Sequence, residues 1–171
     1  MFIERLSEKF SINEPIFTEE ILGLFSEYSR AQVFRYIGKA KKNKEIVQFA
    51  TGVYYIPSVT FWGDLSTITA DSVIEKKYLR NADQTYGIFG GIKLLNNFSV
   101  TTQMAAVIEV VTNNETTRCR EIDINGRKFI LRKSRCEINK NNYAAYTILQ
   151  LFNDFTEQDQ LDESSRRRLF E

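Results

Sequence analysis

The feature that most constrains this chain is a helical pattern that begins at Ser29 and is followed at once by a hairpin pattern. Ser29 and Gln32 have the Ser-x-x-Gln spacing of a capping box, in which the Ser hydroxyl accepts from the Gln32 N–H and the Gln side chain reaches back. Apolar residues then recur at helical spacing: Val33, Phe34, Ile37 and Ala40. The pattern predicts an amphipathic helix over 29–41.

The same segment concentrates positive charge. No acidic residue lies between Ser29 and Lys44, whereas the formal net charge of the whole chain is only +1. A local patch, and not the global charge, must therefore indicate the partner. Arg and Gln side chains on a helix can read base edges in the major groove, and Lys contacts phosphates. We expect double-stranded DNA to bind at Ser29, Arg30, Gln32, Arg35, Tyr36, Lys39, Lys41, Lys42, Lys44 and Thr51.

The elements around this helix follow a familiar order. Residues 2–10 predict a short helix, and a second helix is expected from Thr18 to about Glu27. Residues 46–49 and 53–56 predict two strands, with Gly52 as the turn residue at positive φ. Helix, helix, basic helix and hairpin predict a winged helix-turn-helix over residues 1–58. The tip of the hairpin carries no Arg or Lys, so the hairpin would touch DNA only through its main chain.

The remaining residues predict a smaller mixed α/β domain over 59–155, which makes the expected fold class α+β. Residues 59–70 form a connector, 71–80 and 86–98 predict helices, and 107–112 predicts a strand. Asn125-Gly126 is a hairpin signal that joins 119–124 to 127–135. Residues 142–155 predict a helix whose inward face is Ala145, Ile148, Leu149 and Phe152. The charged residues 156–171 predict a frayed helix or a disordered tail.

A second basic concentration lies in the Asn-Gly hairpin. It consists of Arg118, Arg120, Arg127, Lys128, Arg132, Lys133 and Arg135. Two interpretations stay open: the charges protect an edge strand from aggregation, or they touch DNA backbone or an acidic partner. Glu121, Asp123 and Lys128 form the only set that would suit a metal-dependent nuclease, and their spacing across a turn does not match the usual carboxylate-x-Lys arrangement.

Two smaller features are interpreted as structural. Thr101, Thr102 and Gln103 are expected to bond to the local backbone of a loop, as polar residues after a helix commonly do. The aromatic residues after the hairpin are expected to pack in the core or at the domain joint, and they are Tyr54, Tyr55, Phe61 and Trp62.

The composition excludes several kinds of chemistry. The chain has no histidine, which removes His-based catalysis and His-containing zinc sites. Its two cysteines, Cys119 and Cys136, fit a reduced intracellular pair better than a disulfide. No apolar run is long enough to span a membrane and no signal peptide is evident, so we expect a cytoplasmic protein. We expect no enzymatic activity, no metal and no cofactor.

Four segments of the chain resemble the AbiEi family, the antitoxins of type IV (abortive infection) toxin–antitoxin systems. They are GVYYIPS, VIEKKYL, YGIFGGIKLLNNFSVTTQMAAVIEVVTNN and GRKFILRKSR, and the resemblance covers roughly residues 15–155. The resemblance implies a bacterial repressor whose winged helix binds inverted repeats in its own operon promoter. It places the DNA helix at Ser29–Lys41, the wing at Ile46–Ile56 and the antitoxin region at about 65–155.

The resemblance also implies a partner gene that encodes a nucleotidyltransferase-like toxin, which the protein counteracts with or without direct contact. We expect a monomer or weak dimer with no membrane partner. Two other functions remain open from the sequence: a winged-helix module that binds a protein instead of DNA, and a small metal-dependent nuclease.

Overall fold

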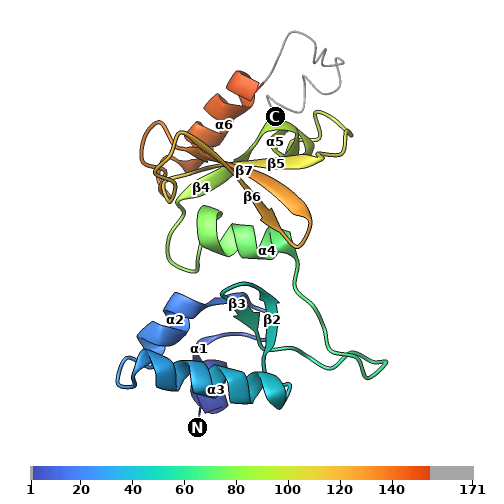
Figure 1. Ribbon diagram of the computed structural model, residues 1–171. Coiled ribbons are helices and arrows are strands. Elements are labelled where there is room, and N and C mark those ends of the chain that lie inside the picture. Colours follow the sequence, from blue (N-terminus) through green and yellow to red (C-terminus); the bar gives the residue numbers. More distant parts are fainter. Residues whose placement is uncertain (1, 155–171) are drawn as a thin grey trace. The chain divides into compact units, whose positions relative to one another are not determined.

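The computed structural model describes residues 2–154 (Figure 1). Helices and two β-sheets make up this range, which confirms the expected mixed α+β class. The chain forms two compact units, of which the first ends at Val73 and the second begins at Ile74. The tail expected at 156–171 lies outside the described residues.

The first unit contains three helices and a small antiparallel sheet. The helices are α1 (Phe2–Lys9), α2 (Thr18–Leu24) and α3 (Arg30–Lys42), and the strands are β1 (Ile16–Phe17), β2 (Val47–Ala50) and β3 (Val53–Tyr55). The strand order is β1-β3-β2. The predictions of α1, α3 and the hairpin are confirmed to within two residues at each end. Strand β1 was not predicted, and α2 ends three residues before Glu27.

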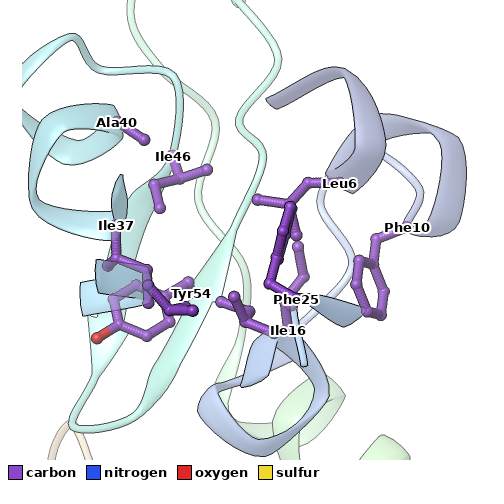
Figure 2. Packing of buried hydrophobic residues seen from close by; sticks show 10 residues of the cluster. Leu6, Phe10, Ile16, Phe25, Ile37, Ala40, Ile46 and Tyr54 are labelled. Atoms are coloured by element: carbon purple, nitrogen blue, oxygen red, sulfur yellow. The ribbon is translucent and has the colours of Figure 1, made fainter. Parts of the chain in front are cut away.

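The core of this unit lies between the helices and the sheet. Figure 2 shows Leu6, Phe25 and Ile37 converging on Ile16 and Tyr54, and all five side chains are buried. From α3 the buried residues are Val33, Ile37 and Ala40. Phe34, which the sequence assigned to the same stripe, is instead 40% exposed. It lies about 100° around the helix from Val33, and so turns away from the core.

The hairpin and the segment after it are held by backbone bonds. Gly52 has a φ of 75°, as predicted, and its carbonyl accepts from the Thr18 N–H at 3.0 Å. Beyond β3, the Ser66 N–H donates to the Ser58 carbonyl at 2.8 Å and closes a loop. At the tip of that loop Phe61 is 95% exposed and Trp62 is 85% exposed.

The packing predicted for Phe61 and Trp62 is therefore wrong, whereas Tyr54 and Tyr55 are buried as expected. The loop turns at Gly63, which has a φ of 84°, so both rings stand at a bend of the chain and not along a strand. Their rings contact each other edge to face, with centroids 5.5 Å apart.

The second unit is built on a four-stranded sheet. Its strands are β4 (Gly87–Gly90), β5 (Val107–Thr112), β6 (Cys119–Ile124) and β7 (Arg127–Lys133), in the order β4-β5-β7-β6. Only the β5–β7 pair is parallel. The other elements are α4 (Ala70–Ile74), the π-helix η1 (Glu75–Leu79), α5 (Gly91–Asn97) and α6 (Tyr143–Asp154). Asn125 and Gly126 both have positive φ, as an Asn-Gly hairpin turn requires.

The helix predicted over 86–98 is wrong in its first half, which forms β4. A Cβ on Gly87 would lie 2.0 Å from the Tyr78 carbonyl oxygen and 2.9 Å from that of Val111. Gly87 therefore allows η1 and β5 to approach this strand closely. The helix starts only after Gly90, with Gly91 at a φ of 55°.

The orientation predicted for α6 is also wrong. The expected inward residues Ile148, Leu149 and Phe152 are 48, 69 and 54% exposed, and Ala145 is exposed as well. The helix instead buries Thr147 and Leu151, and it packs against β4 and α5. In Figure 1 α6 is the orange-red helix. Because the helix is apolar on both sides, its periodicity does not determine which side faces the sheet.

Candidate nucleic-acid interface

Helix α3 begins at the cap that the sequence predicts. The Ser29 hydroxyl accepts from the Gln32 N–H at 3.3 Å, and Ser29 itself has extended backbone angles. The Gln32 side chain does not complete the reciprocal bond; its amide donates forward to the Tyr36 hydroxyl at 3.4 Å. The first turn of α3 contains no acidic residue, so its N-terminal N–H groups can meet an anion.

The cationic side chains of α3 and of the residues after it are all exposed. They are Arg30, Arg35, Lys39, Lys41, Lys42 and Lys44. Within residues 2–154, none of the six forms an ion pair with a carboxylate. Two have other contacts: Lys41 donates to the Gln48 side chain of β2, and the Arg30 guanidinium lies 5.6 Å from the centre of the Phe34 ring. The positive charge of this face is therefore available to a partner.

The side of α3 opposite the core is low as well as basic. At about 100° per residue, Ala31, Arg35, Gly38 and Lys42 point away from Val33, Ile37 and Ala40. A Cβ on Gly38 would meet no atom within 4 Å. The sequence analysis missed Ala31 and Gly38, although a helical wheel drawn from the apolar stripe identifies them. Their small size lets a partner approach the helix backbone between Arg35 and Lys42.

Tyr36 and Thr51 lie beside this face and not on it. Tyr36 is half-buried, and its ring centre lies 5.7 Å from that of Phe2 and 5.6 Å from that of Tyr28. These three rings and Lys39 line part of a cavity of about 530 Å³ between α1 and α3. Thr51 is exposed in the hairpin turn, whose neighbouring Gly52 bonds to the start of α2.

The second basic patch is largely engaged inside its own unit. Arg120 pairs with Glu115 at 2.8 Å, and Arg132 pairs with Glu109 at 2.7 Å. Arg135 contacts the Asn153 side chain at 3.5 Å. The rest of the patch, Arg118, Arg127, Lys128 and Lys133, is exposed.

Strand β6 lies at the edge of the sheet, and four of its six residues are exposed. Charged side chains on such a strand keep other strands from pairing with it. The position of the second basic patch therefore favours the edge-protection interpretation over that of a binding surface.

The carboxylates of the same hairpin have structural partners or none nearby. Asp123 accepts from the Gly126 N–H at 2.8 Å and so supports the turn. Among the residues that the structure describes, no three His, Cys, Asp or Glu side chains gather where they could hold a metal ion. Cys119 and Cys136 are both free and exposed.

Two further observations bear on the predictions from sequence. In the Thr-Thr-Gln loop, the Gln103 N–H donates to the Thr101 hydroxyl at 3.2 Å, which is local loop chemistry as expected. Over 2–154, no helix combines the length and the apolar character that crossing a bilayer requires.

Comparison of the chain with protein-family models, with curated proteins and with solved structures returns no match. What the molecule can do is therefore argued from its own geometry, and α3 is the surface that carries the most specific chemistry.

Proposed function

We propose that the first unit is a winged helix-turn-helix and that α3 is its DNA-recognition helix. The order α1-β1-α2-α3-β2-β3 and the sheet order β1-β3-β2 support this architecture. The observation that carries the function is the exposed cationic face of α3, on which six Lys and Arg side chains have no carboxylate partner in the described range.

The proposed contact follows from the geometry of α3. A duplex has one phosphate charge per about 1.7 Å of axis, and each Lys or Arg that contacts a phosphate releases counterions. Arg35 and Lys42 stand on the outermost side of the helix, and Ala31 and Gly38 leave room for the walls of a major groove. Arg30, Gln32 and Arg35 lie in the N-terminal half, where such a helix reads base edges.

We further propose that the protein is a transcriptional repressor of its own operon and the antitoxin of a nucleotidyltransferase-like toxin. The resemblance of residues 15–155 to the AbiEi family supports this role. The first unit would bind inverted repeats in the promoter, and the second unit would counteract the toxin. A bacterial repressor acts where its promoter is, in the cytoplasm.

The DNA contact is tested by fluorescence anisotropy with a labelled duplex from the protein's own promoter and a shuffled duplex of the same length. We expect the promoter duplex to bind more tightly, and the variant R35A/K42A to lose at least tenfold in affinity. The slope of log K against log[salt] should fall by about 1.8, because each lost phosphate contact removes about 0.9.

The matched control is K128A/K133A, which removes the same charge from exposed positions of the second basic patch. It should bind within about twofold of the wild type with the same salt slope. An unchanged affinity of R35A/K42A would rule out α3 as the recognition helix. Absence of any DNA binding at low salt, together with capture of a protein partner, would favour the protein-interaction module.

The antitoxin role is tested separately in cells that express the toxin encoded beside the gene. We expect the chain to restore growth, and R35A/K42A to restore it equally well because antitoxin activity is assigned to the second unit. Loss of protection in that variant would instead link toxin control to DNA binding.

A further inference from the structure

Helix α6 presents an apolar face to solvent. Ala145, Ile148, Leu149 and Phe152 recur at positions i, i+3, i+4 and i+7, and all four are exposed. Leu149, near the middle, is 69% exposed. The opposite side of the helix already contacts β4 and α5. A helix that is apolar on both sides is the pattern of one covered on both sides.

The outer face is also uncharged. Asp154 is the only charged residue of α6. Its carboxylate accepts from the Gly91 N–H at 2.7 Å and from the Gln150 side chain at 2.6 Å, so this charge is directed toward its own unit. An acidic or basic partner would find no complementary charge here. A second copy of the same face would meet no repulsion.

The four residues are complementary to themselves under a two-fold axis. If two α6 helices pack antiparallel about a point between Ile148 and Leu149, Ile148 of one copy faces Leu149 of the other. Ala145 then faces Phe152, which places a small side chain opposite a large one, as close packing requires. We infer that this face is the contact for a second copy of this chain, in an isologous dimer.

The contact is small. From position 145 to position 152 the helix rises about 11 Å, and three large side chains bury much less than the roughly 800 Å² per partner of a standard interface. The dimer should therefore be weak and depend on protein concentration. This inference does not rest on DNA binding, because it concerns the second unit alone.

Sedimentation equilibrium of the full chain from micromolar to millimolar concentration tests the contact. We expect the weight-average mass to rise from one chain toward two as the concentration increases. L149E should keep the mass of one chain throughout, because it buries a charge in the contact. The matched control A144E adds the same charge at an exposed position beside the face and should associate like the wild type.

The register is tested by exchanging the large and small side chains. F152A leaves a gap and A145F creates a clash, so each should weaken association at least tenfold, whereas A145F/F152A restores small against large and should recover it. All these positions are exposed, and circular dichroism verifies that each variant is folded. A wild type of one-chain mass at every concentration, an L149E variant that associates normally, or a double variant no better than the single ones would each overturn the proposal.

Discussion

Two glycines have opposite surroundings and should respond oppositely to the same added methyl group. A Cβ on Gly38, in the interior of α3, meets nothing within 4 Å, so G38A should raise the free energy of unfolding by about 0.5–1 kcal/mol through helix propensity. A Cβ on Gly87 would overlap the Tyr78 carbonyl at 2.0 Å, so G87A should lower that free energy by about 3 kcal/mol or more, or prevent folding.

Urea unfolding followed by circular dichroism measures both changes. Gly23 in α2 is the control, since it too has open space around its Cβ position and G23A should behave like G38A. A stabilising G87A would mean that β4 does not approach η1 as closely as described.

At the scale of elements, the loop between β5 and β6 depends on one buried carboxylate. Glu115 is 4% exposed and accepts from the Thr116 N–H, the Thr117 N–H and the Thr117 hydroxyl at 2.9–3.1 Å. Burial raises the pKa of Glu115, but the bonds from Thr117 and the charge of Arg120 outweigh it, and the pKa lies below its usual 4.5. The loop thereby joins β6 to the end of β5.

Because the folded state lowers this pKa, the stabilisation is present above about pH 4.5 and is lost as the pH falls through the folded-state value. E115Q should lower the free energy of unfolding by about 1–2 kcal/mol at pH 7. The difference from the wild type should shrink below pH 4. Urea midpoints from pH 3 to pH 8 measure it, and E121Q, at an exposed position of β6, should show neither effect. A pH-independent difference would contradict the role of the charge.

The sequence predicted those elements whose signal is local. The Ser29 cap, the apolar stripe of α3 and the Asn125-Gly126 turn each follow from a few neighbouring residues, and the structure contains all three. Strand β1 was missed because two residues are too few to show a period. Strand β4 was read as helix because its glycines serve contacts with distant segments, and not local conformation.

The candidate site shows the same limit. The cations of α3 are evident in the sequence, but their lack of carboxylate partners within 2–154 is a property of the fold. For the Asn-Gly hairpin the sequence left two interpretations open. Contacts with Glu109 and Glu115, which are remote from their partners along the sheet, decide between them.

At the scale of the whole molecule, the two units have separate buried clusters. One cluster centres on Leu6 and Ile37 in the first unit, and another joins Ile88, Val111 and Ile138 in the second. Compact units with their own cores can unfold independently. We therefore expect G38A and E115Q to shift different calorimetric transitions, and the double variant to show both shifts, additive within about 0.5 kcal/mol. A single transition that both substitutions move would show that the units unfold together.

The loop tip after β3 gives the molecule an optical label of its own. Trp62 is the only tryptophan in the chain, and it stands in water next to Phe61. Its fluorescence should therefore emit at long wavelength and change little when the buried clusters melt. Any molecule that settles on this loop should shift the emission to the blue and shield the indole from acrylamide, so encounters there can be followed without a dye.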